Sequence, residues 1–273
     1  MSNTKTRIIS GIVLLLIVVA SVASGPQATL IMMGIVGLLV IDELIINFYN
    51  QRRNSKRYVL AQSFYICGYY FFNFYQISQS SFNFWISAGI LLNLLLLSYL
   101  FLVYKKSETL LKVFRATSWL TGLIILIPLI CLSYIIHFDD WKLYLFGLFI
   151  LNFMVDTAAY FTGKKFGKHK LWESVSPKKT IEGAIGGVFF SVLATSYFWK
   201  TFISDLTPFV VFFFTLIACS SQVGDLVQSK LKRQFEIKDS SSLIPGHGGV
   251  YDRVDSLIFV APFYAFFLMA NFH

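Results

Sequence analysis

Long apolar segments alternate with short polar segments along almost all of the 273-residue chain. About nine of the apolar segments are long enough to cross a bilayer as α-helices, each of which needs roughly 20 residues. The predicted spans lie at roughly 8–24, 28–48, 58–77, 83–103, 117–137, 143–163, 181–203, 208–228 and 255–272. The pattern therefore predicts an all-α polytopic membrane protein without a soluble domain.

The composition agrees with this fold class. Hydrophobic residues make up 56% of the chain and charged residues 14%, whereas soluble domains have about 45–50% and about 25%. The first apolar segment, after Lys5 and Arg7, could be a secretory signal, but it is long and a second one follows at once, which predicts a retained helix. Cys67, Cys131 and Cys219 lie in apolar segments without metal or disulfide spacing, so we expect small buried residues.

Basic residues determine the predicted orientation. All Lys and Arg residues except Lys142 and Lys200 lie before the first span or between an even-numbered span and the next one. Lys and Arg are enriched in the cytoplasmic loops of membrane proteins, so we predict a cytoplasmic N-terminus and a C-terminus outside. The net charge of +9 would then form a cytoplasmic cationic surface, which also attracts anionic lipid.

Carboxylates within spans are energetically costly and mark functional sites by default. Asp42 and Glu43 lie late in the second span, Asp156 late in the sixth and Asp225 late in the eighth. They predict a polar site in the cytoplasmic half of the bilayer. The alternative is that such carboxylates pair with Lys or Arg for folding alone. We favour that alternative for Asp42 and Glu43, and a functional role for Asp225 and Asp252.

Helical spacing places polar side chains on one face of each of three predicted helices. The faces comprise Ser221, Gln222, Asp225, Ser229, Lys232 and Arg233; Asn152, Asp156, Tyr160 and Gly163; and Asp252, Asp255 and Ser256. Three polar faces at one depth can enclose a cavity. Carboxylates with hydroxyls and water suit Mg²⁺, which in turn suits phosphate. No His/Cys cluster indicates zinc, and a serine hydrolase is weakly supported because no G-x-S-x-G motif is present.

Two loops are richer in ordered polar residues than topology control requires. In the first, "SPKKT" precedes a predicted helix that Ser176 or Thr180 could cap, with Glu182 near its N-terminus. That helix N-terminus and Lys178 and Lys179 together make an anion site, although a solvated basic loop is the alternative.

The second loop combines cations, a glycine turn and carboxylates. Its cations are Lys232, Arg233, Lys238 and Arg253. The turn "PGHGG" at 245–249 allows the backbone to approach a ligand closely, and Asp252 and Asp255 follow it. Cations and carboxylates around a metal describe a polyphosphate site better than a cation channel.

These features divide the chain into two parts. Residues 1–140 are predicted to form an N-terminal transmembrane part with about five spans, and residues 141–273 a C-terminal catalytic transmembrane region. The catalytic region is expected to present cytoplasmic loops at 164–180 and 229–254.

The second loop resembles the bacterial phosphatidate cytidylyltransferase family, also called CDP-diacylglycerol synthases. The family pattern S-x-(apolar)-K-R-x4-K-D-x-(small)-x2-(apolar)-P-x-H-G-G-(apolar)-x-D-R-(apolar)-D is met throughout. The matching residues are Ser229, Lys232, Arg233, Lys238, Asp239, Ser241, Ile244, Pro245, His247, Gly248, Gly249, Asp252, Arg253 and Asp255. A second block, from "DTAAYFTGKKFGKHKL" to "SPKKTIEGAIGG", is also similar, although "WES" at 172–174 departs from the commoner small or Pro residues. Clear similarity covers roughly 152–256.

The resemblance implies that CTP and phosphatidic acid react to give CDP-diacylglycerol and pyrophosphate, a step of phospholipid biosynthesis. It also implies Mg²⁺ dependence with Asp225 and Asp252 as metal ligands, and a monovalent cation such as K⁺ that shares the site in the family. The expected protein is a homodimer in the bacterial inner membrane, with its active site facing the cytoplasm and no nucleic-acid partner.

On this hypothesis an oxygen of the phosphatidate attacks the α-phosphorus of CTP in line, and charge neutralisation and positioning supply most of the catalysis. The expected catalytic residues are Ser229, Lys232, Arg233, Asp252, Arg253 and Asp255. The expected substrate-binding residues are Asp156, Tyr160, Ser176, Lys178, Lys179, Thr180, Glu182, Lys238, Asp239, His247, Gly248 and Gly249. We expect His247 to fix the turn or contact phosphate rather than act as a base.

Three rival functions make different predictions. A CTP-dependent lipid kinase would release CDP. A CDP-alcohol phosphotransferase would carry D-G-x2-A-R and a later G-x3-D-x3-D, which this chain lacks. A transporter would show flux without chemistry, and matching pairs of interrupted helices are not evident in the two halves. The predicted function is therefore cytidylyl transfer.

Overall fold

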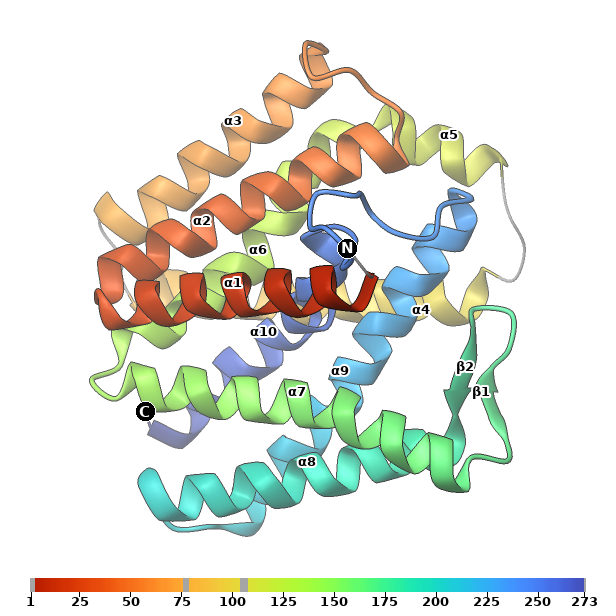
Figure 1. Cartoon of the computed structure of the whole chain (residues 1–273). Helices are drawn as coiled ribbons and strands as arrows, with labels where there is room; N and C mark the ends of the chain where they lie inside the picture. The colour runs from red at the N-terminus through yellow and green to blue at the C-terminus, as the bar shows by residue number, and fades with distance from the viewer. Residues whose placement is uncertain (1–2, 76–78, 104–107, 273) are drawn as a thin grey trace.

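The computed structural model describes residues 3–75, 79–103 and 108–272, and helices dominate it (Figure 1). The helices are α1 (Asn3–Ala23), α2 (Pro26–Glu43), α3 (Lys56–Tyr70), α4 (Gln79–Leu102), α5 (Glu108–Ala116), α6 (Thr121–Ser133), α7 (Trp141–Phe166), α8 (Ile181–Phe202), α9 (Pro208–Gln234) and α10 (Tyr251–Phe272). Short helical turns extend three of them: η1 (Leu44–Phe48) after α2, η2 (Phe71–Tyr75) after α3, and η3 (Ser118–Leu120) and η4 (Tyr134–His137) on either side of α6.

The predicted fold class is confirmed. Among the described residues, 8 helices are long and apolar enough to cross a membrane. The remaining predicted span, 58–77, corresponds as far as it is described to α3 and η2, which pack against α2 and α6. This segment is less apolar than the others because it begins with Lys56 and Arg57 and carries Gln62.

The predicted loop at 164–180 contains a β-hairpin that the sequence pattern did not predict. Strand β1 (Lys170–Trp172) pairs antiparallel with β2 (Ser176–Thr180). The hairpin projects from one end of the bundle and joins α7 to α8 (Figure 1). Thr180, at the end of β2, caps α8, because its Oγ1 accepts a hydrogen bond of 3.1 Å from the Gly183 amide.

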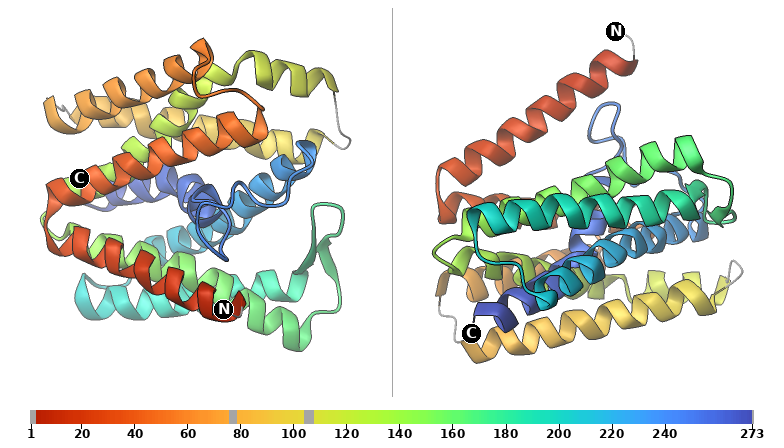
Figure 2. Two further views of the ribbon diagram at one scale, coloured as in Figure 1. Left: turned by 45° about the horizontal axis from the view of Figure 1, so that its top comes forward. Right: turned by 90° about the horizontal axis from the view of Figure 1, so that it is seen from below.

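Helices α7 and α8 pack along each other on one side of the molecule (Figure 2). Glycines permit their close approach: a Cβ atom at Gly183 would lie 2.8 Å from the Ala159 carbonyl oxygen, and one at Gly187 2.8 Å from that of Val155. Helix α9 packs against α10, α8 and α7, and α10 also packs against α6 and α4. The site-bearing helices α7, α9 and α10 are thus in mutual contact.

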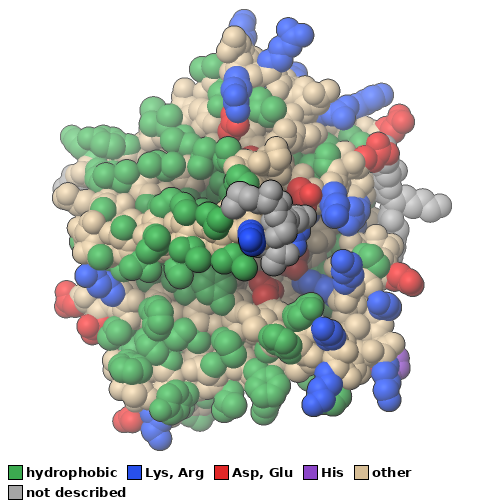
Figure 3. Space-filling view, viewed as in Figure 1, with side chains coloured by type: hydrophobic (Ala, Val, Ile, Leu, Met, Phe, Trp, Pro, Cys, Tyr) green, Lys and Arg blue, Asp and Glu red, His purple; other side chains and the backbone are tan. Residues whose placement is uncertain are grey.

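The outer surface is apolar where lipid would contact it. Ile12, Leu15 and Leu16 on α1 are all exposed, and Figure 2 shows the N-terminal end of α1 apart from the other helices. In Figure 3, Lys and Arg side chains gather mainly along the top and right edges, while hydrophobic side chains cover much of the remaining surface. This charge distribution agrees with the predicted orientation, which stays a prediction.

The expectation of three buried cysteines was wrong for two of them. Cys131 is buried in α6, whereas Cys67 on α3 and Cys219 on α9 are exposed. An apolar segment does not by itself distinguish the lipid-facing side of a helix from its protein-facing side, because both are apolar.

Candidate active site

A polar pocket of about 290 Å³ lies between α7, α8 and the hairpin. Its lining includes five residues predicted to bind substrate, namely Asp156, Tyr160, Lys178, Lys179 and Thr180. Lys164 adds a third lysine to this lining. Residues from the helix end and from the basic loop therefore share one cavity, with an excess of cationic side chains.

A buried polar network joins the three predicted polar helix faces. The Asn152 amide on α7 donates to Ser256 Oγ on α10 over 3.2 Å, and Ser221 Oγ on α9 donates to Asn152 Oδ1 over 2.8 Å. All three side chains are buried. Because each bond satisfies polar atoms away from water, the network fixes α7, α9 and α10 relative to one another.

Asp225 joins the two polar loops. Its Oδ2 forms an ion pair with Lys179 of the hairpin, and its Oδ1 accepts a hydrogen bond of 3.2 Å from Ser229 Oγ, one turn further along α9. The Asp225 side chain is 30% exposed, so its carboxylate is partly accessible. The sequence predicted functional roles for Asp225 and Lys179, but it did not predict their ion pair.

Asp252 is the anchor of the second loop. Its Oδ1 accepts from Lys232 Nζ (2.8 Å) and Gln228 Nε2 (3.0 Å). Its Oδ2 accepts from the Ser240 amide (2.8 Å) and the Gly249 amide (3.0 Å), and it lies 3.0 Å from the Ser240 hydroxyl oxygen. The side chain is only 6% exposed. A carboxylate offers about four lone-pair positions, so protein donors alone fill the capacity of Asp252.

Asp225 is partly exposed and Asp252 is enclosed by donors, and this difference bears on the prediction that both bind Mg²⁺. Asp225 and Ser229 are oxygen donors with spare capacity and fit Mg²⁺, whereas Asp252 has no free position in this arrangement. Within the described ranges, no three His, Cys, Asp or Glu side chains gather closely enough to hold a metal ion. To hold Mg²⁺ jointly with Asp225, Asp252 would have to exchange a protein donor for the ion, and this joint ligation stays a prediction.

Asp255 belongs to the charge cluster around Asp225. It lies close enough to Asp225, Asp156 and Lys232 to interact with their charges, and its Oδ1 accepts a hydrogen bond of 2.7 Å from the Ser256 amide. Carboxylates from α7, α9 and α10 thus lie near one another, as the three polar helix faces predicted, and the lysines of the hairpin and of α9 join them.

Glu43 holds the second loop from the opposite half of the chain. Its Oε1 accepts from Ser241 Oγ (2.7 Å) and the Val250 amide (2.8 Å). Its Oε2 accepts from Ser240 Oγ (2.8 Å) and the Tyr251 amide (2.9 Å). The carboxylate is 3% exposed and lies at the N-terminus of α10, where backbone amides lack helical partners and a negative charge is favourable.

The expectation that Asp42 and Glu43 each pair with a Lys or Arg for folding is met by Asp42 but not by the contacts of Glu43 given above. Asp42 pairs with Arg53 through two hydrogen bonds of 2.9 Å, and it also accepts from Tyr58 over 2.9 Å. This pairing raises the pKa of the Arg53 guanidinium. Glu43 contacts no Lys or Arg in the bonds just described, and its partners are hydroxyls and backbone amides of the predicted catalytic loop.

The "PGHGG" turn needs its glycines for conformation and for space. Gly246 and Gly248 have φ angles of 76° and 86°, in the region that favours glycine. Ile244 and Gly248 form an isolated bridge, with a 2.8 Å bond from the Ile244 amide to the Gly248 carbonyl. A Cβ atom at Gly249 would collide with the side chains of Ser240 and Glu43.

Gly249→Ala should therefore destabilise the protein by about 1–3 kcal/mol, the usual cost of overpacking, and should lower turnover because the loop must move. Thermal unfolding and activity measure both effects. Gly147→Ala is the matched control, since a Cβ there would meet Phe198 at 3.5 Å, an ordinary contact. Equal behaviour of the two variants would contradict the proposed crowding at Gly249.

His247 fixes the turn against α1. Its Nδ1 lies 2.7 Å from Ser10 Oγ, which also donates to the Pro245 carbonyl over 2.9 Å. Arg7 donates to the Gly246 carbonyl over 2.8 Å, and Arg253 to the His247 carbonyl over 2.9 Å. Desolvation, helped by the charges of Arg253 and Arg7, lowers the pKa of His247 below its usual range. The contacts of the turn with Ser10 and Arg7 favour the turn-fixing interpretation.

With this geometry established, comparison with known proteins identifies the family. The profile of the cytidylyltransferase family matches residues 5–271, nearly the whole chain. The chain belongs to the cytidylyltransferase family.

Curated relatives of this chain are named phosphatidate cytidylyltransferase. The Bacillus subtilis (strain 168) protein is 40% identical over 147 residues, which cover 52% of this chain and 54% of the relative. The Staphylococcus aureus (strain COL) protein is 46% identical over 123 residues (44% and 46%), and that of Staphylococcus haemolyticus (strain JCSC1435) 42% identical over 127 residues (45% and 48%). The matched part of the chain spans about half the length of these relatives.

Several other predicted residues do not line the pocket. Arg233, Lys238 and Asp239 are exposed on the second loop and its approach. Ser176 begins strand β2. Glu182 braces the base of the hairpin: its carboxylate accepts from the Lys168 and His169 amides over 3.1 and 3.2 Å, and lies 2.6 Å from His169 Nδ1. Their roles in substrate binding stay predictions.

Sequence reasoning missed Glu43, Gln228 and Ser240 as site residues. One signal was available for Glu43: the residues before α10, "GGV", supply no capping side chain, so its first amides need an acceptor from elsewhere. Gln228 and Ser240 are polar residues of ordinary type, and only the folded position of Asp252 shows their function.

Proposed function

We propose that this protein transfers the cytidylyl group of CTP to the phosphate of phosphatidic acid, giving CDP-diacylglycerol and pyrophosphate. The observation that carries this proposal is the pocket with Lys164, Lys178 and Lys179, whose lining is continuous with that of an apolar groove between α8 and α9. An amphipathic anion such as phosphatidate needs both environments side by side. The family and the names of the relatives support the same reaction.

In the proposed reaction, an oxygen of the phosphatidate phosphate forms a bond to the α-phosphorus of CTP. The bond between that phosphorus and the bridging oxygen to the β-phosphorus breaks, and pyrophosphate leaves with the electron pair. The attacking phosphate is already anionic near neutral pH, so the reaction needs positioning and charge neutralisation more than a strong base. Lys178 and Lys179 would neutralise phosphate charge at the N-terminus of α8, which itself favours anions.

Asp225 would position Lys179 in this scheme, and Lys232 would remain on Asp252 to hold the loop. When bound, Mg²⁺ would neutralise further phosphate charge, and Asp225 and Ser229 are the residues that would hold it. The predicted orientation would place the pocket on the cytoplasmic side, where CTP is available. A homodimer and a K⁺ ion, which the resemblance implies, stay predictions.

Purified protein in detergent micelles with CTP, phosphatidic acid and Mg²⁺ should release pyrophosphate and form CDP-diacylglycerol, and omission of phosphatidic acid should stop both. Lys142→Ala, at the start of α7 and on the opposite predicted face, should retain turnover within about twofold, as surface changes away from a site usually do. Release of CDP instead of pyrophosphate would indicate a lipid kinase and overturn the proposal.

A further inference from the structure

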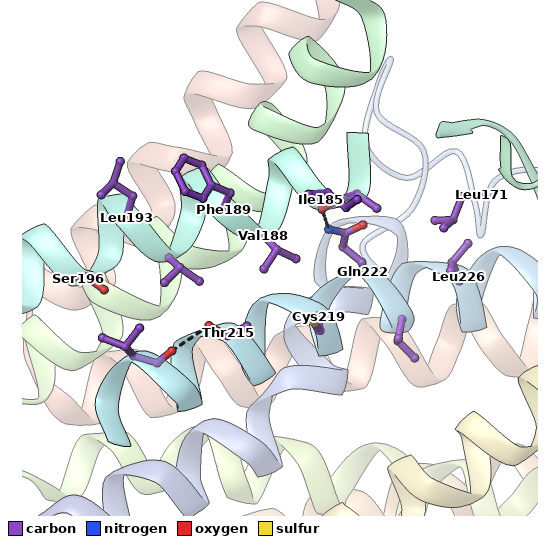
Figure 4. A pocket seen from close by; sticks show the side chains of 14 residues that line it. Leu171, Ile185, Val188, Phe189, Leu193, Ser196, Thr215, Cys219, Gln222 and Leu226 are labelled. Carbon is purple, nitrogen blue, oxygen red and sulfur yellow. Dashed lines mark hydrogen bonds between the residues drawn. The ribbon is translucent and has the colours of Figure 1, made fainter. Parts of the chain in front are cut away.

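An apolar groove of about 710 Å³ separates the exposed sides of α8 and α9. Figure 4 shows Val188, Phe189 and Leu193 of α8 on one side of it, and Thr215 and Cys219 of α9 on the other. Phe189 and Leu193 are exposed, so the groove lies open along its length. In a membrane, lipid chains would be the surrounding medium.

The groove adjoins the polar pocket at one end. Leu171, Ala184 and Gln222 line both cavities. The Gln222 amide donates a hydrogen bond of 2.8 Å to the Ala184 carbonyl, which joins α9 to α8 at this junction (Figure 4). A ligand with its phosphate near Lys178 and Lys179 would therefore have a continuous apolar path beside it.

The dimensions of the groove suit one lipid chain. Its lining on α8 runs from Ala184 to Ser196, which at roughly 1.5 Å per residue is about 18 Å. That length slightly exceeds half of the roughly 30 Å hydrocarbon core, the depth of one leaflet. The volume over this length gives a cross-section of about 40 Å², half of the roughly 80 Å² that a helix about 10 Å in diameter occupies. This narrow cross-section favours a single chain over a whole helix as the occupant of the groove.

We propose that this groove binds one acyl chain of the phosphatidate substrate while the phosphate occupies the polar pocket. This inference rests on the proposed function and adds to it the route of the lipid: the chain lies between α8 and α9, and Gln222 marks the boundary between headgroup and chain. Because the chain comes from an equally apolar medium, the groove contributes van der Waals packing and fixes the position of the chain beside the polar pocket.

Two equally exposed leucines provide a matched pair of variants. Leu193→Trp enlarges a side chain of the groove about 14 Å along α8 from Ala184 at the junction, and Leu91→Trp makes the same change on the exposed side of α4. With dioleoyl phosphatidate, we expect Leu193→Trp to raise KM about tenfold, an effect within the usual range for overpacking. An octanoyl chain is too short to reach Leu193, so with dioctanoyl phosphatidate the rise in KM should shrink to less than about twofold, and Leu91→Trp should resemble the wild type with both lipids.

A photolabelling experiment tests the same site without turnover. Dioleoyl phosphatidate with a diazirine in the middle of one chain should label peptides of α8 and α9 in the wild-type protein, and unlabelled phosphatidate should compete. Labelling confined to other helices, or an equal effect of Leu193→Trp on both lipids, would overturn the groove assignment. Absence of CDP-diacylglycerol from the wild type would refute the proposed function instead, and labelling would still report on the groove.

Discussion

Asp225→Asn is expected to reduce kcat/KM for cytidylyl transfer by about a thousandfold. The amide keeps the size of the carboxylate but loses the charge that holds Lys179, so the hairpin lysine is no longer fixed at the pocket. Removal of one preorganised electrostatic group from an active site costs about 10²–10³ in rate, and loss of an oxygen ligand would add to this. Pyrophosphate release measured over a range of CTP concentrations gives the change.

Asp205→Asn is the matched control for this prediction. Asp205 is exposed in the loop between α8 and α9, away from the hairpin, and the same substitution there should leave turnover within about twofold. Both variants should unfold at the wild-type temperature. If Asp225→Asn were folded and turned over at the wild-type rate, Asp225 would have no part in the reaction.

Glu43→Gln is expected to reduce turnover by about a hundredfold because it releases the second loop, without any direct contact of Glu43 with substrate. Each oxygen of the carboxylate accepts hydrogen bonds from one hydroxyl and one backbone amide. The amide nitrogen of Gln would replace one of these oxygens, and because it cannot accept hydrogen bonds, its two donors would lose their acceptor. Each buried donor left without a partner costs about 1–3 kcal/mol. Hydrogen exchange of the amides of Val250 and Tyr251 should speed up, which a direct role in chemistry would not require.

Asp42→Asn provides the comparison for Glu43→Gln, because Asp42 is the neighbouring residue on α2 but pairs with the exposed Arg53. Exposed ion pairs contribute only about 0–1 kcal/mol, so this variant should keep most of its turnover and normal exchange in the loop. A similar loss in both variants would mean that general damage to α2, rather than release of the loop, explains the effect.

The sequence predicted the helices of this fold well because length and hydropathy follow directly from the thickness of a bilayer. It also predicted that the polar faces of α7, α9 and α10 would meet, and the network of Asn152, Ser221 and Ser256 bears this out. Helical periodicity carries that information because a polar face within a membrane has to avoid lipid.

Other features depend on tertiary contacts that have no periodic signal. The hairpin between α7 and α8 is short, polar and rich in lysine, so the pattern indicates only a loop there. The motif marked Asp252 as a metal ligand, but the folded loop surrounds its oxygens with protein donors. Burial of Glu43 against a loop about 200 residues later in the chain is a non-local contact, which no short segment encodes.

The contacts of α1 and α2 with the second loop also determine how loss-of-function substitutions should be interpreted. Arg7, Ser10 and Glu43 support the "PGHGG" turn and the start of α10, although they lie far from the motif in the chain. A random mutagenesis screen would therefore recover inactive variants at these three positions alongside those in the motif. The fragment 141–273 alone lacks these contacts and should not hold the second loop in its folded conformation. Co-expression with the fragment 1–140 should restore that conformation.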